Sequence, residues 1–206
     1  MTLDNTNKDI IKLRNLANNQ QWFPCEEQTK RLLRQISPQD AIRIALKFMS
    51  YHLDIFEHYH PDVSWPRKCL DNWKLSKPEE REYDWPIYGG GYTSPGTNGY
   101  LNAMGDLRHA LRSEHNSGKI WVNLVGNAIV APINTSALGR WIIQHSYNWN
   151  VMGVDQSRIL AKDDPETQKY KRDTWLEVAN EIEKALGKKD QSTLNNKENP
   201  AWFKLD

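Results

Sequence analysis

The pattern of apolar and polar positions is clearest between residues 37 and 60. Ser37 suits a helix N-cap, Pro38 suits the first helical position, and the carboxylate of Asp40 suits the positive end of the helix dipole. Residues of one face then recur at steps of three and four, and they are Ala41, Ala45, Phe48, Met49, His52, Ile55, Phe56 and Tyr59. This spacing predicts one helix of about five turns with its apolar face in the core. We expect it to end at His60, because proline follows.

Similar start and stop signals predict the other helices. The Ser64-Trp65-Pro66 step predicts a short helix that runs through Trp73. The Asp164-Pro165-Glu166 step predicts a longer helix with Gly187 as its C-cap. Further helices are predicted over residues 10–17, 25–36 and 98–153, the last range holding three helices with breaks near 116–118 and at Pro132.

No segment shows the alternation that predicts a β-hairpin. Residues 76–99 are rich in Pro, Gly and aromatic residues and predict a long loop, a feature that is often functional in a compact domain. We therefore predict an all-α fold, a single-domain bundle of about seven helices that spans residues 1–187 and contains this loop. We expect residues 188–206 to form a polar C-terminal tail, in which Ala201-Trp202-Phe203 supply aromatic docking.

Composition and charge restrict the class of partner. The chain has 206 residues, and its 27 Lys+Arg against 26 Asp+Glu give a formal net charge of +1. No global field favours nucleic acid, so we expect no direct nucleic-acid partner. No run approaches the roughly 18 apolar residues that a membrane span needs, so we expect no membrane partner. Nine Trp and eight Tyr are many for this length, and such rings anchor both cores and interfaces.

Cysteine usage and the N-terminus predict the compartment. Cys25 and Cys69 form neither a CxxC pair nor a disulfide-dense pattern, which is typical of reduced thiols. The first ten residues lack the basic start and apolar core of a secretion signal. We therefore expect a soluble, cytoplasmic protein.

Three histidines within nine positions, His52, His58 and His60, raise the question of a metal site. Residues six apart point to different sides of a helix, so His52 and His58 do not form the i, i+4 pair of zinc helices. His52 lies on the apolar face and is expected to be a hydrogen-bonded core residue, while His58 and His60 suit a helix C-terminus. A metal site built across helices from His52 with His109 or His145 remains an alternative. We assign no metal ligand and no cofactor.

Signals for a catalytic nucleophile are weak. The chain has no G-x-S-x-G elbow, and Cys69 is expected on the buried side of a short helix, where a thiol is inert. Gly89-Gly90-Gly91 lacks the Lys and Ser/Thr of a phosphate loop. No paired carboxylates stand out. We therefore predict no catalytic residue and no enzymatic activity.

An acidic and aromatic cluster lies in the predicted loop, within and just after the sequence PEEREYDWP. Its members are Glu79, Glu80, Glu82, Tyr83, Asp84, Trp85 and Tyr88. Charged residues on a surface loop are often simply solvated. Carboxylates beside aromatic anchors are also what a protein needs to cap a basic groove with fast electrostatic association. We predict that these residues bind a partner, and we call residues 79–88 the acidic-aromatic segment.

The stretch HPDVSWPRKCLDNW at residues 60–73 resembles a pattern of the all-helical immunity proteins of bacterial polymorphic toxin and contact-dependent inhibition systems. In that family a Tyr/His-Pro-Asp step leads to a Pro-Arg pair, a small and apolar pair, and a Trp. The matching residues here are His60, Pro61, Asp62, Pro66, Arg67, Cys69, Leu70 and Trp73. A second, weaker similarity covers residues 126–149, where the family has a small-residue helix, a short break and another helix. Together the resemblance falls within residues 40–150.

The resemblance implies a cytoplasmic protein without catalytic activity that neutralises the C-terminal domain of a cognate bacterial toxin in a one-to-one complex. Occluding an active site requires an interface, and acids that face a basic nuclease cleft would provide one. The near-neutral total charge does not demand a nuclease partner. Two alternatives remain open. One is a helical-bundle metal-dependent enzyme with His52, His109 or His145 as ligands, and the other is a helical adaptor whose Trp-rich surface binds a peptide.

Overall fold

Helices make up all the regular secondary structure in the part of the chain that the structure, a computed structural model, describes. The described residues are 3–75, 77–83, 94–95, 97–113 and 118–198, and the side chains of 3–6, 78 and 188–198 are outside the description. The helices are α1 (Leu3–Asn18), α2 (Trp22–Leu33), α3 (Pro38–Tyr51), α4 (Leu53–Tyr59), α5 (Trp65–Trp73), the short 3-10 helix η1 (Pro78–Glu80), α6 (Thr97–Arg112), α7 (Lys119–Gln144), α8 (Trp149–Met152), α9 (Val154–Lys162) and α10 (Pro165–Glu198). The prediction of an all-α fold is confirmed.

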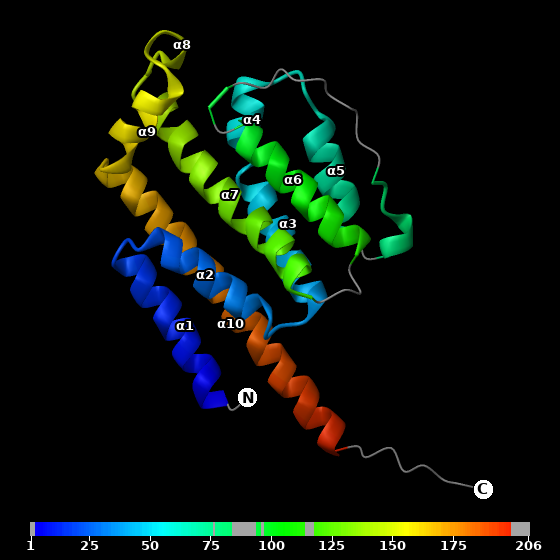
Figure 1. Ribbon diagram of the computed structural model, residues 1–206. Helices are drawn as coiled ribbons and strands as arrows, with labels where there is room; N and C mark the ends of the chain where they lie inside the picture. The colour runs from blue at the N-terminus through cyan, green and yellow to red at the C-terminus, as the bar shows by residue number, and fades with distance from the viewer. Residues whose placement is uncertain (1–2, 76, 84–93, 96, 114–117, 199–206) are drawn as a thin grey trace, which may run out of the picture.

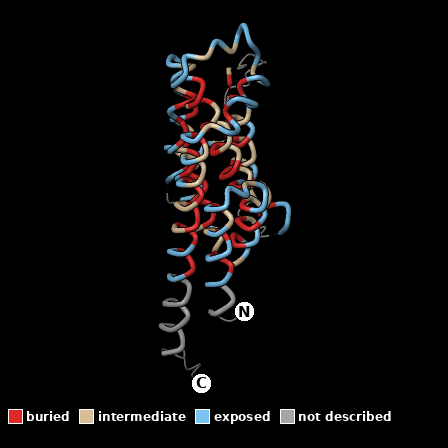
Figure 2. Tube along the Cα trace, turned by 90° about the vertical axis from the view of Figure 1, so that its left-hand side faces the viewer, coloured by how far each residue is buried: buried red, intermediate tan, exposed pale blue. Residues whose placement is uncertain are grey.

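The helices pack in two groups that α7 and α10 join (Figure 1). In one group α1 packs against α2 and α10, and in the other α3 and α6 pack along α7. Because α7 also contacts α10 and α2, the two groups share one core. The short helices α8 and α9 lie at the end of the bundle where α7 ends and α10 begins (Figure 1). Figure 2 shows an elongated bundle with the buried residues along its inside.

Tryptophan contributes mainly to the core in the described residues. Buried indoles belong to Trp65, Trp73, Trp121, Trp141 and Trp175, and half-buried ones to Trp22 and Trp149. The indole N–H of Trp121 donates to the carbonyl of Ala110 at 3.0 Å, which satisfies a polar group that burial would otherwise leave unpaired. The Trp-rich peptide-binding surface of the adaptor alternative is therefore not found in the described residues.

A second, smaller core cluster holds the α8 and α9 end of the bundle. Trp141, Ile142 and Ala161 are buried there. Tyr147 and Trp149 pack against them from the connection between α7 and α9. This end is thus attached through its own small cluster, separate from the main core.

Three predicted helix starts are confirmed. The Ser37 hydroxyl accepts a hydrogen bond from the backbone N of Asp40 at 3.1 Å, as expected of an N-cap. α5 begins at Trp65 and α10 at Pro165. Local chemistry decides these positions, because the cap side chain and the proline act on groups within one turn of helix.

The prediction of one continuous helix from Ser37 to Tyr59 is wrong. His52 separates α3 from α4, with φ −98° and ψ 6°. The break is supported by donors from other helices: the hydroxyl of Tyr100 bonds to the carbonyl of Met49 at 2.7 Å, and that of Ser136 to the carbonyl of His52 at 3.4 Å. Tyr100 lies in α6 and Ser136 in α7, so local spacing gives no sign of them.

Two predicted helix ends are also wrong. α7 runs through Pro132 without a break, and α10 continues past Gly187 to Glu198. Pro132 is buried and α7 packs against α6, α3, α10 and α2, so tertiary contacts outweigh the hydrogen bond that proline removes. Gly187 does not have the positive φ of a glycine C-cap. Residues 201–203, the predicted aromatic docking group, lie outside the described residues.

Candidate functional site

The acidic-aromatic segment begins, in its described part, with η1. The side chains of Glu79, Glu80 and Glu82 are exposed. Glu80 forms an ion pair with Lys77 at 3.0 Å, whereas Glu79 and Glu82 form none with another described residue. Three carboxylates are therefore presented to solvent between α5 and α6, and two of them form no ion pair with another described residue.

Two hydrogen bonds from α5 hold the backbone of this segment at Glu82. The buried indole of Trp73 donates from Nε1 to the carbonyl oxygen of Glu82 at 2.8 Å. The backbone N–H of Glu82 donates to Oδ1 of Asn72 at 2.6 Å. Both backbone groups of one residue are thus bonded to the end of the same helix, which anchors an exposed segment to the core.

Of the other four residues predicted to bind the partner, only Tyr83 lies within the described residues. Tyr83 is half-buried and packs against the main core, with the guanidinium carbon of Arg112 at 5.5 Å from its ring centre. It therefore contributes to the fold as well as to the segment. Asp84, Trp85 and Tyr88, also predicted to bind the partner, lie outside the described residues.

His52 is a buried, hydrogen-bonded core residue, as its place on the apolar face predicts. Its side chain is 0% exposed, and its Nδ1 lies 2.7 Å from the hydroxyl of Tyr170. Burial, and secondarily the positive charge of Arg140, lower the pKa of His52 to about 3. The imidazole is therefore neutral at physiological pH.

The other histidines of the metal alternative do not join His52. His109 is exposed on α6, and Nδ1 of His145 lies 2.9 Å from the carbonyl oxygen of Trp141. Among the described residues no group of three or more His, Cys, Asp or Glu side chains is arranged to hold a metal ion. The hypothesis of a metal site built from His52 with His109 or His145 therefore gains no support from the structure.

Neither thiol lies in an environment that activates it. Cys25 is buried, and burial followed by the charge of Glu26 raises its pKa to about 12. Burial also raises the pKa of the half-buried Cys69. Since the thiolate is the reactive form, neither cysteine is suited to act as a nucleophile at neutral pH.

A cavity of about 440 Å³ lies between α4, α7 and α10, and we call it the Arg140 cavity. Arg140 forms an ion pair with Asp54, and its guanidinium carbon lies 5.0 Å from the ring centre of Tyr170. Through the Tyr170 hydroxyl this chain of contacts reaches the buried His52. Burial raises the pKa of Tyr170. The phenol and the neutral imidazole are both poorly matched to proton transfer near pH 7, so the network is suited to holding three helices together.

Sequence analysis missed the Arg140 cavity. Its ion pair joins residues 86 positions apart, and the contact between His52 and Tyr170 spans 118 positions. No local motif marks such a set, because each residue is individually ordinary on its own helix. Only the packing of α4, α7 and α10 brings them together.

The end of the bundle formed by α8 and α9 exposes apolar side chains. Val151 is 78% exposed and Ile159 is 63% exposed, and Met152 and Leu160 are exposed beside them in sequence. We call these four residues the apolar tip. Clusters of exposed apolar residues often mark interaction sites.

No protein-family model, no curated protein and no solved structure matches the chain. Within the described residues, every helix is too short or too polar to cross a membrane.

Proposed function

We propose that this protein is an immunity protein that binds and neutralises a cognate bacterial toxin domain in the cytoplasm. The observation that carries the proposal is the set of exposed carboxylates on Glu79, Glu80 and Glu82, which extend from a backbone that Trp73 and Asn72 anchor. An anchored acidic surface loses little conformational entropy on binding a basic partner, and its charge speeds association. Covering the active site of a toxin requires no catalytic residue.

The stretch that resembles the immunity proteins, residues 60–73, lies directly beside the acidic-aromatic segment and holds it in place. Residues 60–73 form the turn after α4 and the whole of α5. α5 supplies both Trp73 and Asn72, which hold Glu82 in place. The stretch that carries the resemblance is thus also the base of the proposed interface.

Charge reversal tests the interface directly. The double variant Glu79→Lys, Glu82→Lys should associate about tenfold more slowly with the toxin domain encoded next to this chain, and the difference should shrink at high salt. Association rates measured by surface plasmon resonance at two ionic strengths, together with protection of cells that express the toxin, provide the readout. Neither substitution alters a buried side chain, so the fold should be retained.

A matched control separates local from global charge. The double variant Glu27→Lys, Asp173→Lys changes the net charge equally, at exposed positions on α2 and α10. It should leave the association rate within about twofold of the wild type, because it lies outside the interface. Equal slowing in both double variants, or unchanged association in the first, would refute the acidic-aromatic segment as the interface.

The apolar tip favours a second candidate, an adaptor that binds another protein through α8 and α9. Its exposed side chains are apolar, unlike those of the acidic-aromatic segment, so the two candidates respond to different substitutions. The double variant Met152→Glu, Ile159→Glu should abolish capture of an adaptor's partner and leave toxin protection intact. Loss of protection in this variant would favour the tip over the acidic segment.

A further inference from the structure

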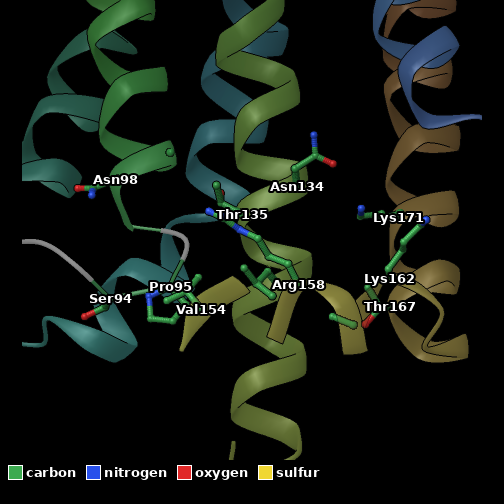
Figure 3. A pocket seen from close by; sticks show the side chains of 13 residues that line it. Ser94, Pro95, Asn98, Asn134, Thr135, Val154, Arg158, Lys162, Thr167 and Lys171 are labelled. Carbon is green, nitrogen blue, oxygen red and sulfur yellow. The ribbon is translucent and has the colours of Figure 1, made fainter. Parts of the chain in front are cut away.

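A second cavity, which we call the cationic cavity, lies between α7, α9 and α10, with residues at the start of α6 on one side (Figure 3). Its volume is about 550 Å³, and ligand sites commonly occupy about 300–1,000 Å³. It shares only Thr167 with the Arg140 cavity and contains no residue of the acidic-aromatic segment. It is therefore a separate site.

Three cations line this cavity, Arg158, Lys162 and Lys171, and no carboxylate does. In Figure 3 Arg158 extends from α9 toward Thr135, while Lys162 and Lys171 lie on the side of α10. Neither lysine forms an ion pair with another described residue. Positive side chains that line one cavity repel one another, and a bound anion relieves that repulsion.

Other carboxylates near the cavity lie outside its lining. Asp155 pairs with Arg158 at 2.9 Å, but its side chain is 91% exposed and water screens its charge. Glu26 accepts a hydrogen bond from Asn134 at 3.2 Å, and burial raises the pKa of Glu26. Asp164 accepts from the backbone N of Thr167 at 2.7 Å, at the start of α10.

Lys171 is the deepest of the three cations. It is half-buried, and its ammonium nitrogen lies 5.9 Å from the ring centre of Trp22. Burial lowers the pKa of Lys171, with the charge of Glu26 acting in the opposite direction. A half-buried amine that faces a cavity and has no ion-pair partner gains more from an incoming anion than an exposed one does.

The rest of the wall determines the shape of the ligand. Pro95, Leu138, Val154 and Ala161 supply an apolar surface beside the cations. Ser94, just before α6, and Asn98, in its first turn, line the opposite side (Figure 3). A wall of this kind suits a compact anionic group attached to a partly apolar body.

We propose that the cationic cavity binds a small organic phosphate of about mononucleotide size, with its phosphate held by Arg158, Lys162 and Lys171. The guanidinium fork matches the oxygens of a phosphate, and lysines serve as point charges for the same group. The apolar wall receives the organic part of the ligand. The proposal does not depend on the immunity function, since the two sites share no residue.

Isothermal titration calorimetry with AMP, inorganic phosphate, adenosine and citrate tests the proposal on the full chain. AMP should bind saturably at one site with a Kd below about 1 mM, inorganic phosphate more weakly, and adenosine not at all. The single variants Arg158→Gln and Lys171→Gln should each bind AMP about tenfold more weakly, because each removes a charge-assisted hydrogen bond. Lys162→Gln, at an exposed position, gives the same test without altering a half-buried side chain.

The control is Lys169→Gln, an exposed lysine on α10 that does not line the cavity. It should bind AMP as the wild type does. Equal weakening in Lys169→Gln and Lys162→Gln would reveal nonspecific attraction and overturn the proposal. So would tighter binding of citrate than of AMP, which would indicate a carboxylate ligand, or the absence of heat from every phosphate probe at several millimolar.

Discussion

The hydroxyl oxygen of Tyr170 in α10 lies 2.7 Å from Nδ1 of His52, at the break between α3 and α4. The imidazole is fully buried, and its Nε2 has no hydrogen-bond partner among the described residues. The Tyr170 hydroxyl thus provides the hydrogen-bond partner of one nitrogen of the buried imidazole. The guanidinium carbon of Arg140 also lies 5.0 Å from the centre of the Tyr170 ring. This contact joins α10 to the corner where α3 ends.

The substitution Tyr170→Phe should destabilise the protein by about 1–3 kcal/mol, because it leaves a buried nitrogen of His52 without a partner. Urea unfolding at pH 7, followed by far-UV circular dichroism, measures the loss. Tyr51→Phe is the control, since Tyr51 is 59% exposed and its substitution should change the free energy of unfolding by less than about 0.5 kcal/mol. A loss no larger in Tyr170→Phe than in the control would show that the hydrogen bond contributes nothing.

Buried His52 should also make stability depend on pH. Burial lowers its folded-state pKa from 6.5 to about 3, so between these values the unfolded chain binds the extra proton. Stability is therefore full above pH 6.5 and falls on acidification, with a slope that approaches about 1.4 kcal/mol per pH unit. Urea unfolding between pH 7 and pH 5 should show this slope in the wild type and a smaller one in His52→Gln.

The control for this pH dependence is His58→Gln, which changes an exposed imidazole. It should retain the wild-type slope. Burial lowers the pKa of His60 as well, so some slope should remain in His52→Gln. An unchanged slope in His52→Gln would assign the whole pH dependence to other groups.

Glu181 on α10 should contribute to stability in a different pH window. Its carboxylate accepts from Lys184 at 2.8 Å, Lys47 at 3.0 Å and Arg43 at 3.1 Å, and these bonds lower its pKa from 4.5 to about 2. The substitution Glu181→Gln should cost on the order of 1–3 kcal/mol at pH 7. Because the native pKa is depressed, this contribution is present above pH 4.5 and is lost as the pH falls toward 2. Urea unfolding of the wild type and of Glu181→Gln at pH 7 and pH 3 measures the stability that this carboxylate contributes.

The comparison for Glu181 is Glu177→Gln, which removes a half-exposed carboxylate that bonds, among the described residues, to Lys47 alone. It should cost less than about 1 kcal/mol. If the two variants lose equal stability, the three-cation arrangement around Glu181 has no special role.

Two glycines in helices should respond in opposite directions to alanine. A Cβ at Gly139 would meet Cγ2 of Ile55, so Gly139→Ala should destabilise the contact of α7 with α4 by about 1–3 kcal/mol. A Cβ at Gly187 meets nothing within 4 Å, and the residue is helical, so Gly187→Ala should stabilise the protein by about 0.5–1 kcal/mol. Thermal unfolding of the two single variants measures both effects.

The glycine predictions have internal checks. The double variant Gly139→Ala, Ile55→Ala should lose less stability than the sum of the losses in the two single variants. The reason is that the added Cβ clashes with the Ile55 side chain, which the second substitution shortens. Destabilisation by Gly187→Ala would instead support the glycine C-cap that the sequence suggests.

Local chemistry made three helix starts and the fold class predictable. Ser37 bonds within its own first turn, and the ring of Pro165 fixes φ near the helical value whatever surrounds it. The spacing of apolar residues likewise predicted the burial of Phe48, Met49 and His52. The acidic side chains Glu79, Glu80 and Glu82 were expected on the surface and lie there.

The sequence by itself determined that the described residues are mainly helical, where α3, α5 and α10 begin and that the face with Phe48, Met49 and His52 is buried, because those properties depend on groups within a few residues of one another. Only the tertiary structure decided the break at His52, the continuity through Pro132, and the gathering of Arg158, Lys162 and Lys171 around one cavity. Each of these rests on contacts between helices that are distant in sequence. Such contacts outweigh local preferences of about 1–3 kcal/mol, and no local pattern records them.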